Sequence, residues 1–503
     1  MKSPKTLVFL TLFTAMALSS CSGTKTACTS NCTGSGNGSV SVTMVADTLP
    51  ANPSILSLQV TIIGITFTSS AGTNQSVTLN PAITLDLMRL QSDTAFLGTF
   101  ANIPSGQYTS ATLAFSNPAK ITFLNDTTAT LSGCAVSAIC PLTSNTAAGT
   151  PVATVSFAVP QSGVTGIGID LNFANAVSIS GGNLVVNFSN NNVLSGFTLP
   201  RANSNLASGQ LELIEDFTGV VSISGSSVTI TSPTRGVLTA TSTSNSFFDQ
   251  SPPPTNLCPS APNNCAVAGQ IASVDAFLKS DGALELKEFE PLNATQQDFV
   301  EGTVYAVNSP TQFTIAVTDK VQAATTSLIS GLNTGDRLTV NIPALTQPFL
   351  VDSKGLAVQN SFGSSYSLFA TQTTTSAVHA GQTVAVHVSA FTAASGTTLA
   401  SANADTVILR WTRLRANVVS ATSATVNIDT LPSYFGISAS SQEVVQAFLN
   451  GALGADGVTN LDGVASNTSG LTTSQRVGLR VLYFQNPGNT ANPAFFAAKI
   501  RQP

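Results

Sequence analysis

Short runs of alternating apolar and polar residues recur along most of this 503-residue chain and constrain its fold more than any other feature. A period of two places every second side chain on one face of an extended strand, which is typical of half-buried strands. The chain is also rich in Thr and Val, which favour strands, and in Ser, Asn and Gly, which favour turns. We therefore predict an all-β fold. In the first 200 residues the clearest runs span residues 40–44, 56–62, 83–87, 108–115, 152–159 and 167–173.

Charged residues are sparse and scattered. They make up 9% of the chain, against about 25% in a typical soluble domain. Nucleic-acid binding depends on clustered Lys and Arg residues that displace counterions from phosphates. The 19 basic residues form no such cluster and the net charge is −5, so we exclude nucleic acid as a partner.

The first 21 residues have the pattern of an export signal. Two lysines precede an apolar stretch over residues 7–18, which is too short to span a membrane comfortably and typical of a signal peptide. The segment Leu18-Ser-Ser-Cys21 resembles the lipobox of bacterial lipoproteins. This resemblance implies that residues 1–20 are removed and that Cys21 carries a lipid anchor in the cell envelope, with the outer membrane favoured because Ser22 follows instead of Asp. The alternative is an ordinary secretory leader with a chance cysteine.

The remaining cysteines follow a flexible tether. Residues 21–38 are rich in Gly, Ser and Thr, a composition typical of flexible linkers. Six further cysteines fall in three close pairs, which indicates short disulfide loops in an exported chain. Zinc is the alternative, but no pair has a histidine or a second pair nearby in sequence to complete four ligands. We expect no metal and no cofactor. The expected disulfides are Cys28–Cys32, Cys134–Cys140 and Cys258–Cys265.

Residues 39–200 form the first expected domain. Within the segment IPSGQY, Pro104 and Gly106 predict a turn from which the next strand starts with Tyr108 directed toward the core. Together with VSVTMVAD and IGIDLNF, this segment resembles uncharacterised domains of bacterial lipoproteins that have a transthyretin-like or carbohydrate-binding-like β-sandwich. The Thr-Asp-Ala-Pro stretch of that family is reduced here to ADTLP at residues 46–50. The resemblance implies a sandwich but no particular activity.

The second half repeats a pattern of strand, hairpin and closing strand. Residues 208–291, 299–411 and 412–503 predict three modules that resemble small Greek-key barrels of the OB type and an uncharacterised bacterial repeat family. Generic β alternation is the alternative. A capping box from Ser440 to Glu443, followed by apolar residues at helical spacing, predicts a short helix that covers the last barrel.

Two acidic clusters are the candidates for catalysis, because paired carboxylates carry out glycoside hydrolysis when they face each other across a cleft. In the second cluster, alternation places Glu288 and Glu290 on one face, as on a solvated strand. The clusters are Glu212, Glu215 and Asp216, and Glu285, Glu288 and Glu290.

The other candidates are weaker. The phase of His387 predicts an exposed strand residue, and His379 is the only other histidine, so a metal site is disfavoured. Residues 456–463 resemble a calcium loop but lack its ligand ladder and closing Glu. No Gly-x-Ser-x-Gly elbow occurs. Trp411 is the only tryptophan, which disfavours sugar binding by stacking and leaves hydrogen bonding through Asn and Thr open.

These features predict a non-catalytic, lipid-anchored protein of the cell envelope with a structural or ligand-binding role. Its expected partners are the membrane, through the anchor, and an envelope glycan or protein. The alternative is an envelope hydrolase of polysaccharide, which would use carboxylates such as Glu215, Glu288 and Glu290 from modules that meet at a cleft.

Overall fold

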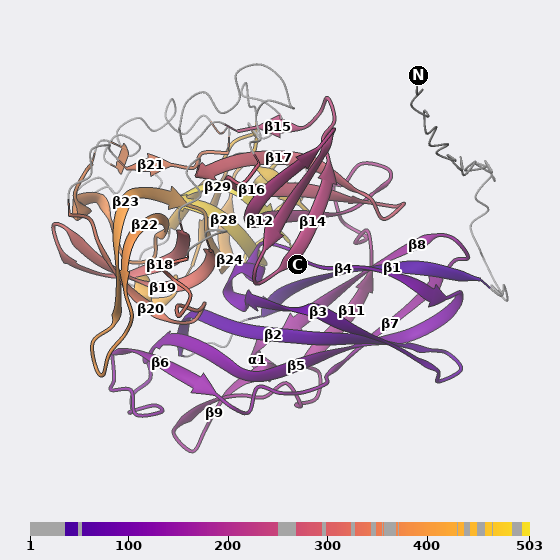
Figure 1. Ribbon diagram of the computed structural model, residues 1–503, viewed down its shortest axis with the longest axis horizontal. Coiled ribbons are helices and arrows are strands. Elements are labelled where there is room, and N and C mark those ends of the chain that lie inside the picture. Colours follow the sequence, from indigo (N-terminus) through magenta and orange to yellow (C-terminus); the bar gives the residue numbers. More distant parts are fainter. Residues whose placement is uncertain are drawn as a thin grey trace, which may run out of the picture.

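The computed structural model confirms the predicted all-β fold with barrel modules, and it arranges a sandwich alongside three smaller modules (Figure 1). In the part of the chain that it describes, no helix is both long enough and apolar enough to cross a membrane. The described residues are 36–48, 53–249, 268–293, 298–322, 327–343, 349–354, 356, 369–370, 372–429, 431–436, 443–449, 458–464, 466–484 and 495–502.

The sandwich packs two sheets around one core. The alternation is visible in β7, where every second residue is buried, and these inward residues build a single apolar cluster shared by both sheets. The first sheet contains, in spatial order, β11 (Leu194–Thr198), β8 (Val164–Asn172), β1 (Asn37–Thr48) and β4 (Ala95–Pro104). The second contains β3 (Asn74–Asp86), β2 (Ser54–Ser69) and β5 (Gly106–Leu124), with β6 (Ile139–Ser144) and β7 (Val152–Val159) both paired to β5. A short helix α1 (Phe173–Ala176) and a hairpin of β9 (Val177–Ser180) and β10 (Asn183–Val186) complete this part.

The turn before β5 places Tyr108 in this core, as the sequence predicts. Tyr108 is 2% exposed, and its ring stacks on Phe157 with 5.3 Å between the ring centroids. The Tyr108 hydroxyl donates a hydrogen bond of 2.9 Å to the carbonyl oxygen of Pro104, so the polar end of the side chain is satisfied. Gly106 adopts φ 152°, a conformation that favours glycine.

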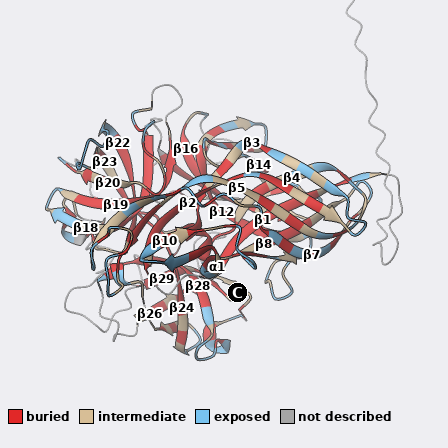
Figure 2. Cartoon of the chain, turned by 90° about the horizontal axis from the view of Figure 1, so that it is seen from below, coloured by how far each residue is buried: buried red, intermediate tan, exposed pale blue. Residues whose placement is uncertain are grey.

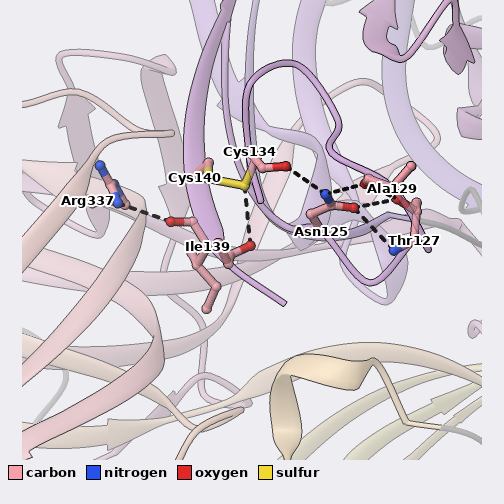
Figure 3. Close-up of a disulfide and its surroundings, with 8 residues drawn as sticks. Asn125, Thr127, Ala129, Cys134, Ile139, Cys140 and Arg337 are labelled. Carbon is pink, nitrogen blue, oxygen red and sulfur yellow. Dashed lines mark hydrogen bonds between the residues drawn. A yellow bond between two sulfur atoms is a disulfide. The ribbon is translucent and has the colours of Figure 1, made fainter. Parts of the chain in front are cut away.

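One of the three expected disulfides lies within the described residues. Cys134 and Cys140 are bonded, with their Cα atoms 5.9 Å apart, at the end of β5 (Figure 3). The side-chain amide of Asn125 donates to the carbonyl oxygens of Ala129 and Cys134, both at 2.8 Å, which fixes the loop that the bridge closes. Cys21 and the pairs Cys28–Cys32 and Cys258–Cys265 lie outside the described residues.

Each of the three modules is a six-stranded sheet with the same order. The first module contains β12 (Gln210–Ser224), β13 (Ser227–Ser232), β14 (Gly236–Thr241), β15 (Phe247–Phe248), β16 (Ile271–Lys279) and β17 (Leu284–Asn293). The second contains β18 (Asp298–Ser309), β19 (Gln312–Val321), β20 (Arg337–Asn341), β21 (Leu350–Val351), β22 (Thr383–Thr392) and β23 (Ala400–Arg410). The third contains β24 (Thr412–Ala421), β25 (Thr425–Ile428), β26 (Glu443–Ala447), β27 (Asn460–Asp462), β28 (Arg476–Tyr483) and β29 (Phe495–Arg501).

Five strands of each module make the barrel. The first barrel strand pairs with the second and the fourth, the fourth pairs with the fifth, and the third runs parallel to the fifth where the sheet closes, which is the order of a Greek-key barrel of the OB type. The closing pairing spans four residue pairs in the second module, three in the third and one in the first. The remaining strand, β15, β21 or β27, pairs in parallel with the fifth barrel strand, further along the edge that the third strand occupies.

The predicted C-terminal helix is wrong. Residues 443–447 form β26, the third barrel strand of the last module, which pairs with β25 and runs parallel to β29. Val444 and Val445 are β-branched and favour strands, and the barrel closes through the backbone of this segment. Four short 3-10 segments lie elsewhere within the described residues: η1 (Leu87–Gln91), η2 (Thr375–Ala377), η3 (Ser433–Phe435) and η4 (Thr468–Gly470).

The sandwich and the modules pack against each other through η1. This turn follows β3 and is capped by Asp86, whose carboxylate accepts a 2.8 Å hydrogen bond from the Met88 backbone N–H. All five residues of η1 are buried. Figure 2 shows buried residues on strands of both the sandwich and the modules. The two parts are in direct contact, because the Ser57 hydroxyl on β2 donates a 2.6 Å hydrogen bond to the carbonyl oxygen of Val317 on β19.

Candidate functional site

The structure concentrates its charged residues in one buried network where the three modules and η1 meet. Its ion pairs connect at least nine of the 19 basic residues with at least eleven of the 24 acidic residues, and no side chain among them is more than 17% exposed. We call this set the ion network. It comprises Arg89, Arg201, Arg235, Lys354, Arg410, Arg413, Arg480, Lys499 and Arg501, with Asp93, Glu212, Glu215, Asp216, Asp275, Glu288, Glu290, Glu301, Asp319, Asp352 and Asp462.

Equivalent strand positions in the three modules carry different charges. On the fourth and fifth barrel strands of the first module, Asp275 lies opposite Glu288. The same cross-strand position holds Arg480 opposite Lys499 in the third module. In the second module it holds two apolar residues, Ala385 opposite Ile408. The modules therefore share a backbone plan but present acidic, apolar and basic surfaces at the same place.

Acidic residues of the first barrel strand of the first module pair directly with basic residues of the third module. Asp216, on a bulge of β12, binds the guanidinium groups of Arg413 and Arg480. Glu215 lies 2.7 Å from the Lys499 ammonium nitrogen. These contacts join strands more than 190 residues apart in sequence.

The second module supplies both signs. Its Lys354 lies 2.5 Å from Glu288 of the first module, and its Arg410 lies 2.6 Å from Glu290 of the first module. Its Glu301 lies 3.0 Å from Arg413 of the third module. Each module is thus bridged to the other two.

An aspartate lies at the end of the added strand in every module: Asp249 and Asp352 directly follow β15 and β21, and Asp462 is the last residue of β27. In the second module the Asp352 carboxylate lies 2.6 Å from Arg410, and in the third the Asp462 carboxylate lies 3.7 Å from Arg501. The first module has Asp249 at this position but a glutamate, Glu290, in place of the arginine. Arg410 therefore forms ion pairs with carboxylates of two modules, Glu290 of the first and Asp352 of the second.

The sandwich enters the network through η1. Arg89 lies 2.5 Å from Glu301, and Asp93 lies 2.8 Å from Arg413. The backbone of η1 also approaches β28 closely, because a Cβ added at Gly478 would lie 2.5 Å from the carbonyl oxygen of Gln91. The same junction buries Asp86, which accepts a hydrogen bond from Ser57, and burial raises the pKa of Asp86 to about 6.

Burial and neighbouring cations act in opposite directions on the acids of the network. Burial raises the pKa of Glu215 to about 7 although Lys499 lies beside it, and burial raises the pKa of Glu290 well above its usual range. Burial also opposes ionisation of Glu301, but Arg89 and Arg413 hold the pKa of Glu301 at about 2. For Asp216 the surrounding Arg480 and Lys354 outweigh burial and hold its pKa well below the usual value.

The expectation that Glu288 and Glu290 lie on a solvated strand is wrong. Both are fully buried, because the face that carries them is covered by the second module. His387 was expected to be exposed, but it is 8% exposed, and its Nε2 lies 2.8 Å from the carbonyl oxygen of Leu292 in the first module. The alternation of apolar and polar residues predicts which side chains share a face of a strand. It does not predict whether another module covers that face.

The remaining predicted residues are dispersed. Glu285 pairs with Lys279 at a partly exposed edge, outside the ion network. Trp411 is fully buried. Asp456 lies outside the described residues, whereas Asp462 belongs to the network. Within the described residues, no group of three or more His, Cys, Asp or Glu side chains could hold a metal ion.

Two larger cavities lie away from the network's centre. One, of about 500 Å³, lies between the first and third modules, and Glu212, Lys287 and Asp462 line it. Arg201 bridges its two carboxylates, at 3.3 Å from Glu212 and 3.6 Å from Asp462. The other, of about 620 Å³, lies between the second and third modules and is lined by uncharged residues and His379. By contrast, the cavity that contains Glu215 measures about 20 Å³, room for about one water molecule.

The topology and the network define an all-β protein that joins one sandwich to three OB-type barrel modules through buried ion pairs. No family model and no curated protein matches this chain. Among solved structures, the Bacillus anthracis TIE protein aligns over 92% of this chain and 72% of its own, with 9% identity and a TM-score of 0.06. A likeness at that TM-score supports no inference about fold or function.

Proposed function

We propose that this chain is a non-catalytic protein of the bacterial cell envelope, anchored by lipid on Cys21, with a structural or ligand-binding role. The leader and the lipobox-like segment support the anchor. The ion network supports a non-catalytic role, because the acids considered for hydrolysis are engaged in joining modules. Glu215, Glu288 and Glu290 are each buried against a cation of another module. This engagement is the observation that carries the proposal.

A structural role is consistent with the way the network is built. Breaking one partner of a buried ion pair leaves an unpaired charge and is strongly destabilising, so such pairs fix which surfaces meet. With about half of its charged residues used in this way, the chain has few charges left for its outer surface. A neutral partner, such as an uncharged glycan, suits that surface better than a charged one.

The lipid anchor is tested by replacing the acceptor thiol. In cells grown with labelled palmitate, the wild-type protein should take up label and sediment with membranes, and Cys21→Ser should do neither. Cys28→Ser is the matched control, since it removes a nearby cysteine outside the lipobox-like segment and should leave both properties unchanged. Label retained by Cys21→Ser would refute the anchor.

A second candidate, hydrolysis of polysaccharide, rests on the cavity between the first and third modules. Glu212 and Asp462 come from different modules and both line it, as a two-carboxylate mechanism requires. Arg201, Lys499 and Arg501 outweigh burial and hold the pKa of Asp462 below its usual value, so Asp462 suits a base or nucleophile and not the acid. Release of reducing ends from neutral polysaccharides, abolished in both Glu212→Gln and Asp462→Asn, would favour the hydrolase over the non-catalytic role.

A further inference from the structure

The cavity between the second and third modules differs from the two other cavities described above, because none of its described lining residues carries a formal charge. Its volume is about 620 Å³, within the range of small-molecule binding sites. Its described lining residues carry hydroxyl, amide, imidazole and aromatic groups, and none of them is Asp, Glu, Lys or Arg. The residues important here are Tyr305, Asn308, Thr374, Ser376, His379 and Phe435.

The position of the cavity is meaningful in an OB-type barrel. One wall is the hairpin between the first and second barrel strands of the second module, β18 and β19, with its turn at Ser309 and Pro310. Loops at this place in OB folds are among those that bind oligosaccharides and oligonucleotides. Because this wall lacks the basic residues that bind phosphates, its chemistry fits an uncharged oligosaccharide better than an oligonucleotide.

The walls are held in place before any ligand arrives. The Thr375 backbone N–H donates to the carbonyl oxygen of Pro310 at 2.9 Å, and the Thr375 hydroxyl donates to the carbonyl oxygen of Ser309 at 2.5 Å. These bonds fasten the segment around η2 to the hairpin. Such fastening lowers the entropy lost on binding.

The third wall comes from the last module. Phe435 stacks on Tyr434 with 5.2 Å between centroids, and it lies 5.5 Å from the ring of Tyr483. Its ring also fills the space beside Gly381, where an added Cβ would lie 2.2 Å from it. The aromatic wall is therefore rigid.

Hydrogen-bonding groups remain for a ligand. The His379 ring has no hydrogen bond to any described residue, and burial lowers the pKa of His379, so the ring is neutral with one donor and one acceptor nitrogen. The Asn308 amide nitrogen donates to Thr314 at 2.7 Å, which orients its carbonyl oxygen as an acceptor.

We propose that this cavity binds a neutral oligosaccharide, with His379 and Asn308 contacting sugar hydroxyls and with Tyr305 and Phe435 supplying the apolar walls. This inference rests on the ligand-binding role proposed above and names its ligand class. It does not depend on the lipid anchor.

The test is calorimetric titration of the purified protein with neutral linear tetrasaccharides of glucose, xylose and N-acetylglucosamine, and with anionic tetragalacturonate. We expect saturable binding of at least one neutral probe and none of the anionic probe. His379→Ala and Asn308→Ala should each weaken that binding about tenfold or more. Asn183→Ala, on the exposed hairpin of β9 and β10 in the sandwich, is the matched control and should bind as the wild type does.

Three outcomes would overturn the inference: no neutral probe binds up to about 10 mM, both cavity variants bind as the wild type does, or the anionic probe binds more tightly. Unchanged thermal unfolding of the variants separates loss of the site from loss of the fold. Absence of sugar binding would say nothing about the lipid anchor on Cys21. Absence of palmitate label on the protein would likewise say nothing about sugar binding.

Discussion

The first and third modules have the same strand order and opposite charge where they meet. Asp275 and Glu288 of the first occupy the cross-strand position that Arg480 and Lys499 occupy in the third. The shared topology decides which positions face inward, and the sign of the charge decides which module can lie there. Since three barrels of one design could pack in several orders through apolar contacts alone, we infer that the ion network specifies a single arrangement.

The largest loss of stability is expected from removing the carboxylate of Asp216, through which the first module binds two arginines of the third. Asp216→Asn leaves the guanidinium groups of Arg413 and Arg480 without their shared carboxylate, and should lower the free energy of unfolding by about 3–5 kcal/mol. Asn is chosen because Asp216 has φ 48°, which Asn tolerates. Denaturant unfolding measures the change. Glu285→Gln, in a partly exposed pair of the same module, is the control and should change it by less than about 1 kcal/mol.

A smaller loss of stability is expected from a substitution at the contact between η1 and the third module. Gly478→Ala places a methyl group against the Gln91 carbonyl oxygen, and the resulting shift of packed backbone should cost about 1–3 kcal/mol of unfolding free energy. Gly331→Ala is the matched control, because an added Cβ there meets nothing within 4 Å. Equal stability of the two variants would show that the sandwich does not pack tightly on β28.

The acids of the first module should also give stability a characteristic dependence on pH. Because burial raises the pKa of Glu215 from an ordinary 4.5 to about 7, the folded state holds a proton that the unfolded state has released between those values. The contribution of Glu215 is therefore present below pH 4.5 and is lost as the pH rises through 7, by at most about 1.4 kcal/mol per unit. Glu215→Gln should flatten the decline of the unfolding free energy across this range. An unchanged slope would contradict the assigned burial.

The smallest effect is expected at the rim, between the sandwich and the second module. Lys120 lies 3.0 Å from Asp336, but both side chains are more than a quarter exposed. Lys120→Ala should lower the unfolding free energy by about 0–1 kcal/mol, and the loss should shrink further in high salt. A loss as large as that of Asp216→Asn would mean that burial does not distinguish the network from surface pairs.

The sequence predicts the strands well because alternation is a local property. The runs around Val40 and Tyr108, and the repeated modules, follow from period and turn chemistry alone, and the structure confirms an all-β fold with barrel modules. The helix expected after Ser440 does not form, because residues 443–447 pair with β29 and close the barrel. This non-local pairing overrides the local capping pattern.

The ion network could not be predicted from periodicity, since it depends on which module covers which face. A signal was nevertheless present. The closing strands place charges two residues apart around an apolar residue, as Glu288 and Glu290 do around Phe289, and as Lys499 and Arg501 do around Ile500. When the modules are aligned, the pair in the first module is acidic and the pair in the third module is basic. Strands exposed to solvent have no reason to carry opposite charges at equivalent positions.

The central claim is tested most directly by exchanging the charges of one pair that joins the first and third modules. Glu215 and Lys499 lie 2.7 Å apart, so Glu215→Lys and Lys499→Glu should each destabilise the protein in denaturant unfolding. The double variant restores the opposite signs and should recover part of the loss, with a coupling of about 1–3 kcal/mol. Strictly additive losses would mean that these modules do not recognise each other by charge.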